Sequence, residues 1–166
     1  MNKIRMIALA ACMAATLDAS AQEQEIRLFS HRGGRMEHDE NTLSAFQASY
    51  DAGYRGFETD IRMTRDGALV ITHDSSLERT TDGTGTVEEK TEAEIRQLAT
   101  KQGNKMMFLD ELLEFLEGKE GLYVEFEMKT KPEALYPEER LHAYCGKLYA
   151  AVMAVKPADA TFVFPS

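Results

Sequence analysis

Residues 56–62 read GFETDIR, and their side chains alternate between two kinds. In a β-strand, successive residues point to opposite faces, so Glu58 and Asp60 share one face and the apolar residues share the other. Residues 124–129, VEFEMK, repeat this pattern with Glu127 on the acidic face. Strands of a parallel sheet are buried on both faces. We therefore predict two neighbouring strands that bring carboxylates into one buried place.

The rest of the chain alternates between predicted strands and predicted helices. The strands are expected at 26–30, 56–62, 68–72, 122–129 and 161–164, and helices follow the caps Asn41, Thr91 and Asp110 or begin at Pro137. Polar side chains at 41, 91 and 110 can accept a hydrogen bond from the first helical turn. Proline at the start of a helix removes no bonded N–H. This alternation is typical of a parallel α/β architecture.

The pattern is compatible with a doubly wound sheet and with a parallel (β/α)8 barrel of the TIM-barrel type. Residues 26–166 contain no internal repeat and no linker, so we expect one domain. A barrel typically needs about 250 residues. Once the first 21 residues are set aside, 145 remain. We therefore expect about the first five strands of eight, which is the N-terminal part of a truncated barrel.

The candidate metal ligands are Glu58, Asp60 and Glu127. Buried carboxylates are costly unless they are paired or bound to a cation. Three of them converging from two strands form an all-oxygen site, which suits Ca2+ or Mg2+. The alternative is a salt-bridge network among Glu58, Asp60, Arg32 and Lys129.

Two histidines stand where predicted strands end. His31 follows the first strand and His73 follows the third. In barrel enzymes the carboxyl ends of the strands carry the catalytic groups. Because imidazole titrates near neutral pH, two histidines beside an anionic substrate can act as general base and general acid.

Seven ordered segments together resemble the glycerophosphodiester phosphodiesterase family. They are HRG at 31–33, ENT at 40–42, ETD at 58–60, TRDG at 64–67, HD at 73–74, LERTT at 77–81 and EFEMK at 125–129. The resemblance runs from residue 28 to about residue 130. One departure is Asp39, which stands where the family usually has proline before the ENT segment, and we expect it to affect only the stiffness of that loop.

The resemblance implies a barrel fold and a metal-dependent phosphoric diester hydrolase that converts glycerophosphodiesters to glycerol 3-phosphate and an alcohol. It implies the same roles for the residues singled out above. His31 and His73 match the acid–base pair, and Arg32 and Lys129 match the phosphate-binding cations. Glu58, Asp60 and Glu127 match the ligands of one divalent cation. In the family mechanism the glycerol hydroxyl attacks first, and water then opens a cyclic phosphate.

The N-terminus has the layout of a secretory signal peptide at residues 1–21. Lys3 and Arg5 precede an apolar run, and an A-x-A site ends at Ala21. The run is too short to span a bilayer, so we expect no transmembrane segment and an exported protein, periplasmic or secreted. A lipoprotein anchor at Cys12 is the less favoured alternative. Cys145 would be the only cysteine left, and we expect it to be a small buried residue.

The charge of the chain bears on its partners. The net charge is −9, and removal of residues 1–21 leaves 17 basic and 27 acidic residues, a balance of −10. Such a surface repels phosphate backbones, so we expect no nucleic acid partner. We expect a small glycerophosphodiester as substrate, and the oligomeric state is left open.

Two other functions fit the same residues. The chain could be a non-catalytic fragment that only binds glycerol phosphate, although a binder has no need of two proton-transfer groups. It could also be a related phosphodiesterase that acts on phospholipids or sugar phosphodiesters. Neither the alcohol head group nor the choice between Ca2+ and Mg2+ follows from the sequence. We also expect the 166-residue chain alone to fold poorly or to be weakly active, because strands that close a barrel would be missing.

Overall fold

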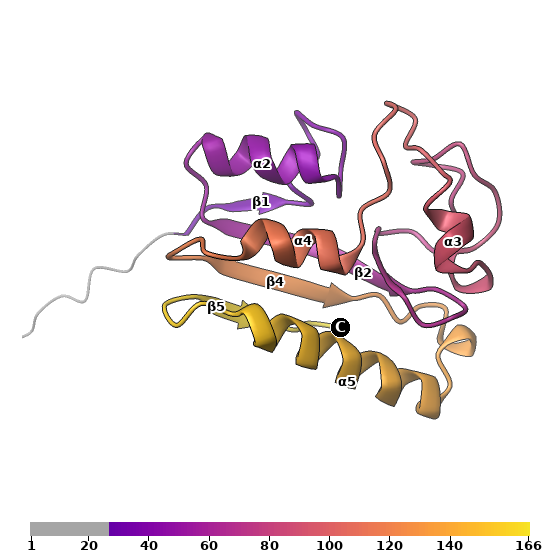
Figure 1. Ribbon diagram of the computed structural model, residues 1–166. Helices are drawn as coiled ribbons and strands as arrows, with labels where there is room; N and C mark the ends of the chain where they lie inside the picture. The colour runs from indigo at the N-terminus through magenta and orange to yellow at the C-terminus, as the bar shows by residue number, and fades with distance from the viewer. Residues whose placement is uncertain (1–26) are drawn as a thin grey trace, which may run out of the picture.

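The computed structural model describes residues 27–166, which form one sheet with helices packed against it (Figure 1). The predicted signal peptide and Cys12 lie outside the described residues. The strands are β1 (Phe29–His31), β2 (Gly56–Met63), β3 (Leu69–Ile71), β4 (Tyr123–Met128) and β5 (Thr161–Val163). The helices are α2 (Leu43–Asp51), α3 (Glu92–Ile95), α4 (Leu109–Leu116) and α5 (Glu138–Val155), with short 3-10 turns η1 (Val87–Glu89) and η2 (Glu133–Leu135).

The sheet has five strands, and its main path runs in the order β1-β2-β4-β5 with every pair parallel. Helices α2, α4 and α5 lie side by side on one face of this sheet (Figure 1). This arrangement confirms the predicted α/β class with a largely parallel sheet. Among the described residues, no helix is both long enough and apolar enough to cross a membrane.

Strand β3 is the exception to the predicted parallel order. It pairs with the end of β2 in the antiparallel sense, with Ile61 opposite Ile71 and Met63 opposite Leu69. The physical reason is the length of the connection, because residues 64–68 form a tight turn with a positive φ at Gly67. A parallel pair needs a crossover of a dozen or more residues.

The apolar face of the central strands builds the main core. Phe57 and Ile61 of β2 and Phe126 of β4 are fully buried and belong to one cluster with residues of α4 and α5. The acidic residues of the same strands therefore point away from this layer of helices. A second cluster of buried residues forms the core of the long segment between β3 and α4. It contains Val70, Leu77, Val87, Ile95, Met106 and Phe108.

Three predictions about local structure were wrong. Asp110 does not cap α4, because the helix begins at Leu109 with Phe108 as its N-cap residue, so Asp110 lies within the first turn. Thr42, and not Asn41, caps α2, since its hydroxyl accepts from the backbone N–H of Ala45 at 3.3 Å, while Asn41 adopts a positive φ of 58°. Cys145 is exposed, because it lies next to the buried face of α5 and not on it. The buried side of α5 is otherwise as predicted, and the Tyr144 hydroxyl donates to the carbonyl of Ile61 at 2.6 Å.

Candidate active site

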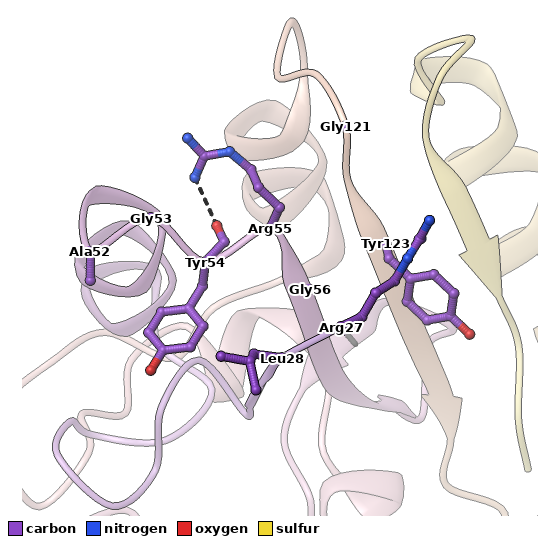
Figure 2. Close-up of a pocket in the computed structure, with 9 residues that line it drawn as sticks. All are labelled: Arg27, Leu28, Ala52, Gly53, Tyr54, Arg55, Gly56, Gly121 and Tyr123. Carbon is purple, nitrogen blue, oxygen red and sulfur yellow. Dashed lines mark hydrogen bonds between the residues drawn. The ribbon is translucent and has the colours of Figure 1, made fainter. Parts of the chain in front are cut away.

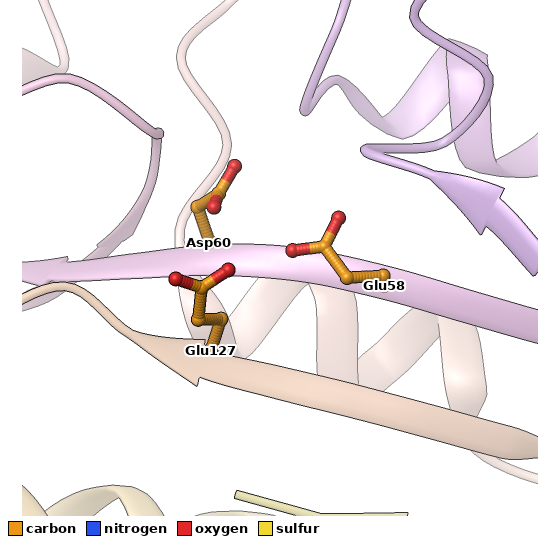
Figure 3. Close-up of side chains that lie close together, drawn as sticks. All are labelled: Glu58, Asp60 and Glu127. Atoms are coloured by element: carbon orange, nitrogen blue, oxygen red, sulfur yellow. The ribbon is translucent and has the colours of Figure 1, made fainter. Parts of the chain in front are cut away.

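Three carboxylates meet beside the middle of β2, where the parallel strand β4 ends. Glu58 and Asp60 project from β2 and Glu127 from β4, and Asp60 lies opposite Glu127 in the register of the two strands (Figure 3). One oxygen of each side chain lies within 4.8 Å of the other two. Asp60 is fully buried and Glu58 is nearly so. The structure thus brings together the three residues that the sequence predicted as cation ligands.

Asp60 lies at the centre of a set of positive and polar partners. The Arg32 Nε lies 3.0 Å from Asp60 Oδ2, and the Lys129 ammonium lies 3.0 Å from Oδ1. Asn41 Nδ2 also donates to Oδ2 at 2.9 Å, and Lys129 pairs with Glu127. The ion pairs expected of a salt-bridge network are therefore present, and they share the carboxylates of the candidate cation site.

Glu58 has fewer hydrogen-bonding and charged partners than Asp60. Its Oε2 accepts from the backbone N–H of Arg32 at 3.1 Å, but its Oε1 is buried and has no hydrogen-bond partner within residues 27–166. Burial, followed by the nearby charge of Asp60, raises the pKa of Glu58 to about 7. A buried acceptor without a donor beside two further carboxylates is what a divalent cation would satisfy. The residues therefore fit such a cation.

The turn after β1 is built by its glycines. Arg32, Gly33 and Gly34 all have positive φ, at 54°, 76° and 98°. A side chain at Gly33 would come within 3.0 Å of atoms of Ala45 and Phe46 on α2, so the close approach of the turn to this helix requires glycine. The turn holds the backbone N–H of Arg32 against Glu58 and directs its guanidinium to Asp60.

The two histidines occupy different surroundings. His31 Nε2 lies 3.5 Å from Glu58 Oε2, and burial together with the charges of Arg32 and Arg35 lowers the pKa of His31. His73 presents Nδ1 to Asp74 Oδ1 at 2.6 Å. The charge of His73 contributes to the lowered pKa of His31, so the two imidazoles act on each other electrostatically.

The sequence of the chain matches the model of the glycerophosphoryl diester phosphodiesterase family over residues 31–160. The chain belongs to this family. A glycerophosphodiester phosphodiesterase of Caldanaerobacter subterraneus is 36% identical over 123 residues, which is 69% of this chain and 50% of the relative. The chain spans about half the length of this curated relative.

Solved structures of the same family show the same fold. A glycerophosphodiester phosphodiesterase from Agrobacterium tumefaciens is 29% identical, with a TM-score of 0.66 over 86% of this chain and 59% of that one. A phosphodiesterase from Oleispira antarctica is 27% identical, with a TM-score of 0.71 over 84% of this chain and 56% of that one. The Oleispira protein was solved in complex with the product sn-glycerol-3-phosphate. These likenesses confirm the predicted barrel-type fold and the predicted family.

Four further residues surround the candidate site, and the sequence did not predict them as site residues. The pattern predicts Asn41 as a helix cap and indicates Glu40, Asp74 and Arg79 only as members of the segments that resemble the family. In the structure Glu40 accepts from Arg32 at 3.2 Å and from Arg79 at 2.6 Å, and Arg79 also pairs with Asp74. A signal was available for all four, since each lies in one of the segments that carry the resemblance to the family.

A buried ion pair lies behind the loop that carries His73. Arg62 donates to Glu88 Oε1 at 2.7 Å, and its Nε donates to the carbonyl oxygen of His73 at 2.9 Å. Glu88 also accepts from Ser75 and from Tyr136, each at 2.7 Å. Both charged side chains are less than a tenth exposed. The pair therefore joins the end of β2 to the segments on either side of the site.

Replacing Arg62 by methionine is expected to destabilise the protein strongly. The change leaves Glu88 buried without its cation, which typically costs about 3 to 5 kcal/mol. Urea denaturation of both proteins measures the free energy of unfolding. Arg65→Met is a matched control, because Arg65 is 60% exposed, pairs with Glu94 at 3.6 Å and makes one exposed hydrogen bond, to the carbonyl oxygen of Glu89. A loss of stability no larger than that of the control would show that the buried pair contributes little.

A cavity at the opposite end of the strands is not part of this site. It has a volume of about 490 Å³ and is lined by the starts of β2 and β4 and by the turn that precedes β2, including Tyr54, Arg55 and Tyr123 (Figure 2). Arg55 donates to the carbonyl oxygens of Tyr50 and Tyr54 there. Since barrel enzymes place their chemistry at the carboxyl ends of the strands, we assign no reaction to this cavity.

Proposed function

We propose that the protein is a metal-dependent phosphodiesterase that hydrolyses glycerophosphodiesters to glycerol 3-phosphate and an alcohol. The observation that carries the proposal is the convergence of Glu58, Asp60 and Glu127 at the carboxyl edge of the sheet, with His31 beside them. Membership of the family and the product bound to the Oleispira relative support the class of substrate.

The three carboxylates would hold one divalent cation, Ca2+ or Mg2+. Such a cation supplies positive charge to the phosphoryl oxygens and orients them. Arg32 and Lys129 lie at the same place, each 3.0 Å from an oxygen of Asp60. Their head groups supply further positive charge for the phosphate, which stabilises the negative charge that develops during transfer.

His31 and His73 would divide the proton transfers. In the first step one imidazole takes the proton of a glycerol hydroxyl, whose oxygen forms a bond to phosphorus. The other imidazole donates a proton to the oxygen of the leaving alcohol as its bond to phosphorus breaks. In the second step the roles reverse, because water attacks the cyclic phosphate and the ring oxygen receives a proton. The product is glycerol 3-phosphate.

We also propose that the protein is exported after cleavage behind Ala21. The support is the signal-peptide layout of residues 1–21, with a basic start, an apolar run and an A-x-A site. N-terminal sequencing of the mature protein recovered from the cell envelope or the medium tests this. A sequence beginning at Gln22 is expected, whereas a blocked N-terminus at Cys12 would indicate a lipoprotein.

Release of glycerol 3-phosphate from glycerophosphocholine tests the proposed activity. The assay is run with Ca2+, with Mg2+ and with a chelator, on the 166-residue chain and on the protein expressed from its whole reading frame. The protein expressed from its whole reading frame is expected to be active with cation and to lose this activity with chelator. Cation binding without release of glycerol 3-phosphate would instead favour a binding fragment, and release from a lysophospholipid or a sugar phosphodiester alone would favour a related phosphodiesterase.

A further inference from the structure

The segment LERTT at residues 77–81 has no role in the proposed reaction, although its arginine points at the site. Arg79 pairs through Nε with Asp74, and its two terminal nitrogens donate to the carboxylate of Glu40 at 2.6 and 3.1 Å. Glu40 in turn accepts from Arg32 at 3.2 Å. A continuous line of alternating charges therefore runs from Asp74 to the phosphate-binding Arg32.

The far end of this line is His73. Its Nδ1 lies 2.6 Å from Asp74 Oδ1, so Nδ1 is engaged and Nε2 is left for another partner. Burial tends to raise the pKa of Asp74, but hydrogen bonds from Arg79 and His73 outweigh burial and lower it. Asp74 is therefore ionised at neutral pH. An ionised carboxylate can only accept, so Nδ1 must carry the proton and neutral His73 must present Nε2 as a base.

The loop that carries these residues is firmly anchored. The side chain of Leu77 is 1% exposed and belongs to the second core cluster. The Thr81 hydroxyl donates to the carbonyl oxygen of Leu77 at 2.7 Å, and the backbone N–H of Thr81 donates to the same oxygen at 3.0 Å. Arg62 fixes the carbonyl of His73 from behind. Arg79 thus starts from a defined position when it reaches Asp74.

We propose that Asp74 is a positioning residue that fixes the tautomer and the orientation of His73, and that Arg79, held by Glu40, keeps Asp74 in place. The kinetic part of this inference rests on the proposed phosphodiesterase activity. The structural part does not, because it concerns the state of one imidazole. The triad of a serine hydrolase uses the same logic, in which a carboxylate at Nδ1 makes Nε2 the working nitrogen.

Another histidine of the chain provides an internal comparison. His142 also lies near a carboxylate, but its Nε2 is 3.8 Å from Glu138 and both side chains are more than three-quarters exposed. An exposed ion pair of this kind is worth little. His73 differs from His142 in two ways. Its contact with a carboxylate is short, and that carboxylate, Asp74, is paired with Arg79, which is itself held by Glu40.

Nitrogen NMR of the protein expressed from its whole reading frame, labelled with 15N-histidine, tests the structural part. The His73 signals are assigned by their loss in His73→Gln. We expect neutral His73 to be mainly the Nδ1–H tautomer in the native protein. In Asp74→Ala the population is expected to shift toward Nε2–H, and in Arg79→Gln to shift in the same direction by a smaller amount. His142 is expected to be unchanged in both variants.

Kinetics tests the functional part. Asp74→Ala is expected to lower kcat by about 10- to 100-fold, a portion of the 10²–10⁴-fold that acid–base catalysis supplies, while KM changes by less than about threefold. Asp110→Ala, which removes an exposed carboxylate from α4, is the control and should leave kcat unchanged.

Each outcome decides the inference. A native His73 that is mainly Nε2–H, or a tautomer that does not respond to Asp74→Ala, overturns it whether or not the protein is active. A changed tautomer with unchanged kcat overturns the kinetic part alone. A changed tautomer in a protein that has no activity on any phosphodiester supports the positioning and refutes the proposed function. Thermal unfolding monitored by circular dichroism confirms that each variant is folded when it is measured.

Discussion

Replacing either His31 or His73 by glutamine is expected to lower kcat for glycerophosphodiester hydrolysis by about 10²- to 10⁴-fold, which is the usual contribution of general acid–base catalysis. Glutamine keeps the size and the hydrogen-bonding capacity of the side chain but cannot exchange a proton near neutral pH. Because the proposed reaction has two steps in which the histidines exchange roles, loss of either one impairs both steps. Steady-state kinetics with cation present measures the effect.

The effects of the two substitutions on kcat are expected to be non-additive. Residues that act as a unit lose most of their effect when the first member is removed. The double variant should therefore be close in kcat to the weaker single variant. His142→Gln is the matched control, because His142 lies on the exposed face of α5 and is 79% exposed. If His73→Gln retained more than about a tenth of the activity, His73 would not be a proton-transfer group, and the inference about Asp74 would lose its kinetic basis.

The carboxylate cluster could be predicted from sequence because strand geometry is simple. A period of two places Glu58 and Asp60 on one face, and the parallel register then brings Glu127 opposite Asp60. Both steps depend only on backbone geometry, which is common to all strands. His31 was found for a related reason, since the end of a parallel strand lies at the carboxyl edge of the sheet.

The network around these residues could not be predicted in the same way. Asn41 reaches Asp60 because its backbone takes a positive φ, and nothing in the order of residues 40–42 distinguishes that turn from an ordinary helix cap. Arg79 and Glu40 are 39 residues apart and meet only because the loop between β3 and α4 folds over its own core. Contacts between loops depend on packing of the whole chain, which a local pattern does not encode.

The direction of β3 could not be predicted from the strand pattern alone. Residues 68–72 were correctly predicted as a strand, but a strand pattern carries no information about the direction of its partner. The length of the connection does carry it, because the turn at residues 64–68 is too short for a crossover. His73 still lies near the carboxylates, because β3 runs back along β2 from Met63 toward its middle, where the N–H of Thr72 donates to the carbonyl oxygen of Asp60.

Glu58→Gln is expected to stabilise the cation-free protein at pH 8 and to abolish its response to cation. Burial and the charge of Asp60 raise the pKa of Glu58 from 4.5 to about 7. The pKa of Glu58 is higher in the folded state than in the unfolded state, so the native protein binds more protons in this range. The free energy of unfolding therefore falls as pH rises from about 4.5 to about 7. The loss is complete above pH 7 and is on the order of 3 kcal/mol at about 1.4 kcal/mol per unit.

Glutamine removes this cost because it is neutral at every pH in that window. Its Oε1 can still accept from the backbone N–H of Arg32, which now donates to Glu58 at 3.1 Å. In chelator, the variant and the native protein are therefore expected to unfold at similar urea concentrations at pH 4.5. The variant is expected to be the more stable at pH 8. Glu117→Gln, on the exposed end of α4, is the control and should show no such divergence.

With a divalent cation present at pH 8, the native protein should become more stable than the Glu58→Gln variant. Native protein gains about 2.7 kcal/mol when free Ca2+ is 100 times its dissociation constant, because the cation binds only the folded state. The variant has lost one of three carboxylates and should gain much less, and its hydrolytic activity should fall at least about 100-fold, since one metal ligand is gone.

The stabilisation by cation should also grow between pH 6 and pH 8 in the native protein. Below pH 7 the cation has to displace the proton of Glu58, and metal binding that releases a proton strengthens as pH rises. Denaturation curves at several pH values, with Ca2+, Mg2+ or chelator, measure both effects. If Glu58→Gln were still stabilised by cation as strongly as the native protein, the ion would bind at another site. A variant less stable than the native protein in chelator at pH 8 would mean that Glu58 is already satisfied by its neighbours, and the fit of a cation to this site would lose its main support.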